Sequence, residues 1–329
     1  MKSRRDFLKT AAVGAAVIGS RSNIGLAAML DAHSSRVVIA RDAALYSADG
    51  SVDEKRIADL LDRAIAAYTG RDKPIEAWKR IVPVGKVIGL KINSVGGKAI
   101  ATHLALTLAI CERLQQAGVK PGEIVVWEFS NSAIERAGYT IATDRNRIRC
   151  IGTDTPGYGY EEQPQACGAV NVHLSKILTR ECDFVINLPV PKDHNLAGVT
   201  FSMKNPFGAV EHPNELHANG CNPSVAELNS LPAIRNKIRF TIGDALSSIY
   251  QGGPQFRPET LWHPNALIVG EDRVALDYTV WQMIEAKRAE MGLQTLAAVG
   301  RPTTFLTTAA QAKYNLGTND PNRIQRMEI

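Results

Sequence analysis

The sequence of 329 residues has only five cysteines, and no two of them form a Cys-x-x-Cys pair. Ferredoxin-type iron–sulfur clusters and zinc ribbons need closely spaced thiolates, so we expect neither. The sequence also lacks a Gly-x-x-x-x-Gly-Lys-Ser/Thr phosphate loop, a His-Glu-x-x-His zinc motif, an EF-hand loop and a Gly-x-Ser-x-Gly nucleophile turn. Enzyme classes that carry these short signatures are therefore disfavoured.

Long hydrophobic runs are also scarce. The apolar stretch at residues 11–19 is much shorter than the roughly 20 residues that a membrane-spanning helix needs. It follows the basic segment SRRDFLK at residues 3–9 and precedes small residues at 25–27, which is the pattern of a cleaved export signal. The basic segment resembles a twin-arginine (Tat) signal. Residues 1–27 are thus predicted to be a signal peptide that the Tat translocase recognises, and the mature protein is predicted to be periplasmic or extracellular.

An excess of charge of one sign is missing from the rest of the chain. The whole sequence carries +5 at pH 7, but residues 1–27 hold five of the 38 basic residues and one of the 33 acidic residues. Residues 28–329 are therefore nearly neutral, at about +1. Nucleic-acid binding relies on a clear basic excess, so we expect no nucleic-acid partner and no stable membrane span.

Short β-branched runs alternate with helical patterns in residues 28–329, which we expect to form a single domain. Apolar strands separated by helices are typical of parallel sheets. The sequence therefore predicts an α/β fold, with a mostly parallel sheet flanked by helices and a long polar excursion at residues 187–231. Strands are predicted at 36–40, 87–93, 123–128, 149–152, 183–188, 237–242 and 266–269, and helices at 53–68, 102–117, 174–180 and 274–287.

Polar side chains follow the ends of several predicted strands. Lys91 and Asn93 end the second strand, Lys192 and His194 follow the strand at 183–188, and Asp244 follows the strand at 237–242. Because ligands of open α/β sheets bind beyond the carboxyl ends of the strands, we expect these groups to face one site. Lys91 and Asn93 are candidate cofactor-binding residues there.

The polar excursion adds further candidates. Lys204 and Asn205 stand before a proline and can present an ammonium group and an amide to an anion. His212, His217 and Cys221 follow and are candidate ligands of a divalent metal such as zinc. Their spacing matches no zinc signature, so histidines that contact substrate or make ordinary hydrogen bonds are the alternative.

An ordered set of short motifs runs from about residue 84 to residue 277. They are KIN at 91–93, NLP at 187–189, KDH at 192–194, MKN at 203–205 with Gly208, His217, GD at 243–244, GGP at 252–254, and ED at 271–272 with Asp277. Together they resemble the DUF362 family. The resemblance implies an α/β domain that is often exported and is in some members joined to a ferredoxin-like module, whose cysteines are absent here.

Two functions fit these residues. The first is an exported enzyme that uses a divalent metal or another cofactor and acts on an anionic small molecule. In it Lys192, Lys204 and Asn205 hold negative charge, His194 or His217 is a base or a ligand, and Asp244 orients a histidine or binds metal. The second is an exported binding or accessory protein that holds an anion or a metal without catalysis.

Overall fold

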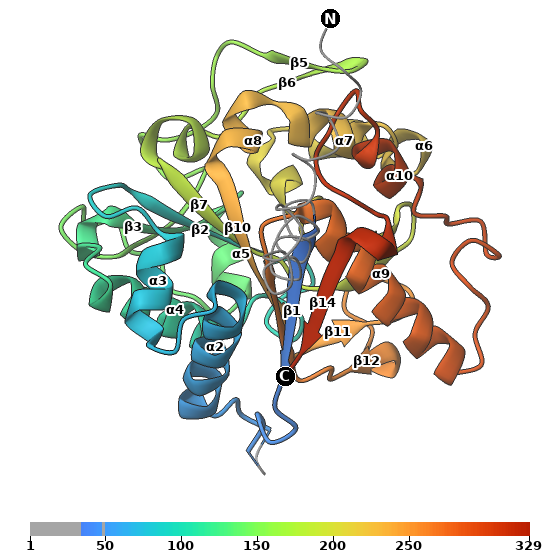
Figure 1. Cartoon of the computed structure of the whole chain (residues 1–329). Helices are drawn as coiled ribbons and strands as arrows, with labels where there is room; N and C mark the ends of the chain where they lie inside the picture. Colours follow the sequence, from blue (N-terminus) through green and yellow to red (C-terminus); the bar gives the residue numbers. More distant parts are fainter. Residues whose placement is uncertain (1–33, 48–49) are drawn as a thin grey trace, which may run out of the picture. The chain divides into compact units, whose positions relative to one another are not determined.

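The structure, a computed structural model, describes residues 34–47 and 50–329, of which Ser35–Ile329 form one unit. The predicted export signal at residues 1–27 lies outside the described residues. A sheet of eight strands forms the centre of the unit (Figure 1). In chain order these strands are β1 (Ser35–Arg41), β2 (Ile88–Ile92), β3 (Ile124–Glu128), β4 (Arg149–Gly152), β7 (Phe184–Leu188), β10 (Ile238–Ala245), β13 (Ala266–Gly270) and β14 (Ile324–Glu328).

The sheet is mostly parallel. Its strands lie in the order β14-β1-β13-β10-β7-β2-β3-β4, and every neighbouring pair is parallel except the two pairs that β13 forms with β1 and β10. The predicted α/β fold with a mostly parallel sheet is therefore confirmed. Because β2, β3, β7 and β10 run in the same direction, their carboxyl ends meet at one edge of the sheet.

Helices flank the sheet. Figure 1 shows α2, α3 and α4 grouped together, with α7, α9 and α10 apart from them. The bounds are α2 (Glu54–Thr69), α3 (Pro74–Ile81), α4 (Leu104–Gln116), α5 (Asn131–Arg136), α6 (Ala218–Cys221), α7 (Ser224–Ser230), α8 (Pro232–Lys237), α9 (Arg273–Glu290) and α10 (Thr304–Ala310). In the described ranges, no helix has both the length and the apolar character needed to cross a membrane.

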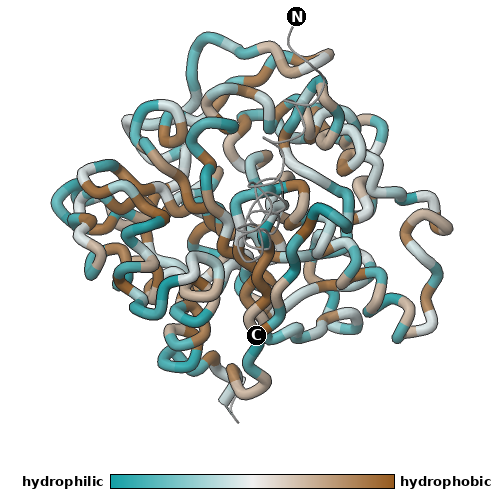
Figure 2. The backbone as a smooth tube through the Cα atoms, viewed as in Figure 1, coloured by the Kyte–Doolittle hydropathy of each residue, from teal (hydrophilic) through white to brown (hydrophobic). Residues whose placement is uncertain are grey.

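The side chains of β1 show why both faces of the sheet are covered. Val37 and Ile39 belong to the apolar cluster that includes α9, whereas Val38 and Ala40 belong to the cluster that includes α2 and α4. Successive side chains of a strand point to opposite faces, so a strand that is apolar throughout must be buried on both sides. Figure 2 shows this apolar character along the central strands.

Local signals set the helix ends as the sequence predicts. Asp53 caps α2 by accepting a hydrogen bond from the backbone N–H of Arg56, and Gly70 ends this helix in the left-handed conformation. Asp272 caps α9 in the same way as Asp53 caps α2. The predicted helix at 174–180 is confirmed only in part: a helical turn spans Ile177–Glu181, but Leu174 and Ser175 instead make β-bridges to distant residues.

The predicted excursion at 187–231 leaves the main sheet after β7 and contributes to a second sheet. This sheet has the order β12-β11-β8-β9. Its strands are β8 (Lys192–His194), β9 (Gly198–Thr200), β11 (Ser248–Ile249) and β12 (Leu261–Trp262), and a separate hairpin joins β5 (Gln165–Cys167) to β6 (Val170–Val172). All five cysteines of the chain are buried, and none forms a disulfide.

Candidate active site

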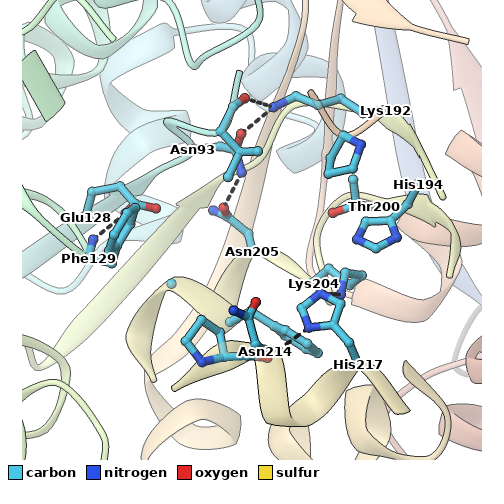
Figure 3. Close-up of a pocket in the computed structure, with 15 residues that line it drawn as sticks. Asn93, Glu128, Phe129, Lys192, His194, Thr200, Lys204, Asn205, Asn214 and His217 are labelled. Carbon is cyan, nitrogen blue, oxygen red and sulfur yellow. Dashed lines mark hydrogen bonds between the residues drawn. The ribbon is translucent and has the colours of Figure 1, made fainter. Parts of the chain in front are cut away.

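A cavity of about 290 Å³ lies beyond the carboxyl ends of β2, β3 and β7, where the excursion returns over the sheet edge (Figure 3). It is lined by residues from both the strand ends and the excursion. The polar lining residues used below are Asn93, Glu128, Lys192, His194, Lys204, Asn205 and His217. Six of these seven were predicted as site residues, and the structure brings them together around one cavity.

Lys192 is the most deeply buried cation of the cavity wall, with 1% of its surface exposed. Its Nζ donates hydrogen bonds to Asn93 Oδ1 at 2.6 Å and to the backbone oxygen of Val95 at 2.5 Å. Burial lowers the pKa of Lys192 to about 7. The group therefore changes charge near neutral pH, which is unusual for a lysine.

A chain of side-chain amides extends from Lys192 into the protein. Asn93 Nδ2 donates to Asn205 Oδ1 at 3.0 Å, and Asn205 Nδ2 donates to Asn187 Oδ1 at 2.8 Å (Figure 3 shows the first of these bonds). Asn187 then donates to the backbone oxygen of Ser202. Each amide accepts on one side and donates on the other, so the chain fixes the orientation of all three asparagines.

Lys204 is the second cation of the cavity. Its Nζ lies 3.2 Å from the sulfur of Cys221, 3.4 Å from His217 Nε2 and 3.7 Å from the centre of the Phe207 ring. Burial lowers the pKa of Lys204. Among the described residues, no carboxylate lies within ion-pair distance of Lys204 or of Lys192. The two ammonium groups are thus available to an anionic ligand.

The turn that carries Lys204 is held by Asp277 of α9. Asp277 is fully buried and accepts hydrogen bonds from the backbone N–H groups of Ser202 and Met203. Burial raises the pKa of Asp277 to about 7. Asp277 therefore fixes the backbone immediately before Lys204, and with it the position of the Lys204 side chain.

His194 and His217 lie beside Lys204 with their rings stacked, at a centroid distance of 5.6 Å and an interplanar angle of 16° (Figure 3). Nδ1 of His194 accepts hydrogen bonds from two backbone N–H groups, at Leu196 and Ala197, so its proton is on Nε2. Nδ1 of His217 donates to the backbone oxygen of Pro213 at 2.9 Å, which leaves Nε2 as an acceptor.

Both imidazoles are neutral at pH 7. Burial, with a smaller contribution from Lys204, lowers the pKa of His194 to about 2. Burial and then Lys204 also lower the pKa of His217. One ring therefore offers a hydrogen-bond donor and the other an unprotonated acceptor, which is a suitable pair for moving a proton.

Glu128 also lines the cavity, and its carboxylate forms an ion pair with Lys91. Glu128 Oε1 lies 2.6 Å from Nζ of Lys91, and both side chains are almost completely buried. Lys91, predicted as a cofactor-binding residue, thus lies behind the cavity wall. Gly208 permits this packing, because a Cβ atom there would lie 2.8 Å from both charged groups. The rule that placed Lys91 and Asn93 at a strand end also points to Glu128, the last residue of β3.

Asp244 lies outside the cavity lining. It holds His103, which precedes α4, by accepting from its backbone N–H at 2.7 Å and by contacting its Nδ1 at 2.9 Å. Asp244, predicted as a catalytic residue that orients a histidine or binds metal, thus contacts His103 and not a histidine of the cavity. Burial opposes the charged imidazole, but the neighbouring Asp244 carboxylate raises the pKa of His103 overall. His103 and Asn187 were not among the predicted site residues.

The candidate metal ligands do not assemble into a ligand set. His212 is exposed and absent from the cavity lining, His217 lines the cavity, and Cys221 contacts Lys204 from behind. Within residues 34–47 and 50–329, no three His, Cys, Asp or Glu side chains come close enough together to hold a metal ion.

The fold and the cavity define an α/β protein with a ligand site at the carboxyl edge of a mostly parallel sheet. The sequence model "Domain of unknown function (DUF362)" matches residues 88–282, which is more than half of the chain. The chain therefore belongs to the DUF362 family. The matched span includes every residue that lines the cavity.

No curated protein matches the sequence. Two solved structures are similar in fold. One is the crystal structure of a protein from Thermotoga maritima, with 11% identity and a TM-score of 0.44, which covers 71% of this chain and 59% of that chain. The other is the lactate racemase apoprotein from Thermoanaerobacterium thermosaccharolyticum, with 14% identity and a TM-score of 0.34 over 66% of this chain and 52% of that chain. The chain thus spans less than two thirds of the length of either.

Proposed function

We propose that the protein is an enzyme that acts on an anionic small molecule bound in the cavity. The observation that carries this proposal is that Lys192 and Lys204, both buried at the cavity, lack carboxylate partners within the described residues. Buried ammonium groups are destabilising unless they are paired or neutralised. A small carboxylate or phosphate would supply the missing negative charge.

The two histidines supply the chemistry in this proposal. His217 Nε2 is unprotonated and accepts a proton from the bound molecule, while His194 Nε2 donates a hydrogen bond to it. Lys204, 3.4 Å from His217 Nε2, stabilises the negative charge that develops when the proton leaves. The asparagine chain keeps Lys192 in place for the acid group.

Proton removal can be detected before the natural substrate is known. We expect the protein to catalyse incorporation of deuterium from D2O into at least one member of a panel of small carboxylates, followed by proton NMR. His217→Gln removes the acceptor nitrogen, so its exchange rate should fall by about 100-fold or more, within the usual range for loss of a general base.

His173→Gln is the matched control. His173 Nδ1 also donates to a backbone oxygen, that of Glu161 at 2.7 Å, but this residue does not line the cavity. The control should exchange at the rate of the unaltered protein. A panel that stabilises the protein against heat without any exchange would contradict catalysis and support the alternative of an anion-binding protein. If no carboxylate of the panel binds to the protein or undergoes exchange, both the catalytic function and the anion-binding function are contradicted.

We also propose that the protein is exported in folded form through the Tat route, on the basis of the SRRDFLK segment at residues 3–9. Replacing Arg4 and Arg5 together by lysine preserves the charge of the segment. We expect this variant to remain inside the cell, as measured by fractionation and immunoblotting of bacteria that express the full chain. Export of the variant at the level of the unaltered protein, or export in cells without the Tat translocase, would contradict the proposal.

A further inference from the structure

A groove adjoins the cavity on the side of the loop that follows β2. Its volume is about 500 Å³, and it shares Val95 and Phe129 with the cavity lining. Because the same two residues border both spaces, the groove lies directly beside the cavity. The combined space is larger than a small acid alone would need.

The groove presents two aromatic rings to solvent. Phe129 follows β3 and is 38% exposed, and Phe256 lies after β11 and is 37% exposed. Phenyl rings are usually buried, and exposed apolar groups that gather in a hollow are a mark of ligand binding. The floor between them includes the backbone of Gly96 and Gly97, which have no side chains to fill the space.

Two polar groups of the groove lack partners. Ser94 is 6% exposed, and its hydroxyl makes no hydrogen bond in the described part of the chain. Arg136, at the end of α5, is exposed and makes no ion pair or side-chain hydrogen bond with any described residue. The Ser94 hydroxyl oxygen is itself buried, so Arg136 is the polar group that is open to a ligand in the groove.

The loop that carries Phe256 is firmly anchored next to the cavity. Asp193 of β8 accepts from the backbone N–H of Gly253 at 3.1 Å and is itself paired with Arg301 at 2.8 Å. Pro254 of the same loop lines the cavity, two residues before Phe256 enters the groove. The same loop therefore fixes the position of Pro254 in the cavity wall relative to Phe256 in the groove wall.

We infer that the groove is the second half of the ligand site and binds an aromatic ring of the substrate. This inference rests on the proposed function, because it places the acid group of the same molecule at Lys192 and Lys204. The ring packs against Phe129 and Phe256, and a polar substituent on the ring meets Arg136. The substrate class is therefore an aromatic molecule with an acid group on a short linker.

Binding of matched acids to the full mature chain tests this inference. We expect 3-phenylpropanoate to bind about 3- to 10-fold more tightly than 3-cyclohexylpropanoate, as measured by calorimetry, since aromatic pairs add this much beyond buried area. Phe256→Leu should reduce that difference, because only the Phe129 ring remains, and leave the affinity for propanoate unchanged. Leu108→Ala, at a 53% exposed apolar residue outside the groove, is the control and should alter neither affinity.

Arg136 is tested with a second acid pair. 3-(4-Carboxyphenyl)propanoate should bind more tightly than 3-phenylpropanoate, and Arg136→Gln should abolish this gain. If propanoate binds to the unaltered protein but the phenyl ring adds no affinity, or adds the same affinity in Phe256→Leu, the inference about the groove is wrong while the proposed function stands. If no acid binds to the unaltered protein, the proposed function itself fails.

Discussion

Replacing Lys192 by methionine should weaken binding of a small carboxylate by about 10- to 100-fold. A hydrogen bond to a charged group contributes about 1.5–3 kcal/mol, and the Lys192 ammonium is the deepest cation of the cavity. Methionine has a similar length and no charge, so it removes the ammonium and leaves the shape of the wall nearly intact. Calorimetric titration of the carboxylate into the purified protein measures the change.

Lys237→Met is the matched control for this change. Lys237 also donates to two oxygens, the backbone carbonyls of Leu178 and Thr179 at 2.9 and 2.7 Å, but it does not line the cavity. Its replacement should leave anion affinity within about twofold of the unaltered protein, and circular dichroism should show that both variants are folded. Equal losses in the two variants would contradict a binding role for Lys192.

The pH dependence of binding gives a second test of Lys192. Because burial lowers the pKa of Lys192 to about 7, the group is an ammonium below that pH and a neutral amine above it. An anion binds the ammonium form, so affinity should decrease as pH rises above about 7, by at most about tenfold per pH unit for one proton. The carboxylates of Glu128 and Asp244 act in the opposite direction and raise the pKa of Lys192. Lys204, His194 and His217 also line the cavity, and they are present both in the unaltered protein and in Lys192→Met. Lys192→Met should lose the decrease; its persistence there would assign the titration to another group.

Removing Lys91 should destabilise the folded protein by about 3–5 kcal/mol, because it leaves the buried carboxylate of Glu128 without its partner. The two side chains are 0% and 2% exposed, so water cannot replace the lost ion pair. We expect Lys91→Met to show this loss as a lower free energy of unfolding in urea. The double variant Lys91→Met with Glu128→Gln should recover most of the stability, since it removes both charges.

The ion pair between Lys55 and Asp59 provides the control. Its atoms are also 2.6 Å apart, but its side chains are 83% and 58% exposed. Lys55→Met should lower the free energy of unfolding far less than Lys91→Met does, because exposed ion pairs contribute little to stability. If Lys91→Met and Lys55→Met were equally stable, the buried pair would have no special role in the fold.

Much of the cavity follows from one rule applied to the sequence. Apolar runs predict the strands, and polar residues after the strands predict the edge at which Asn93, Lys192 and His194 meet. The rule works because the carboxyl ends of parallel strands share one side of the sheet. The same rule places Asp244 near this edge, but it cannot tell which neighbour Asp244 holds; the structure shows that neighbour to be His103.

Residues of the excursion are harder to place, because no periodic pattern determines the path of an irregular segment. His212, His217 and Cys221 are close in sequence, yet His212 is exposed, His217 faces the cavity and Cys221 lies behind Lys204. Asn219 and Cys221 have positive φ angles, as does Gly220 between them, so a left-handed turn separates Cys221 from His217. The short helix Pro213–His217 in turn follows His212. The closeness of His212, His217 and Cys221 in the sequence therefore did not predict a common metal site.

From the amino-acid sequence alone one can predict seven of the eight strands of the main sheet, the long helices α2, α4 and α9, the mostly parallel order and the edge at which polar residues gather. These features depend on the periodicity of apolar residues and on caps such as Asp53, which are local properties of the chain. The pairing of charges, in contrast, depends on the tertiary structure. Lys91 has a buried partner in Glu128, and Lys192 has no carboxylate partner among the described residues, although both lysines lie near the carboxyl end of a parallel strand. The difference arises because ion pairing depends on distances between residues far apart in sequence, which folding alone brings together.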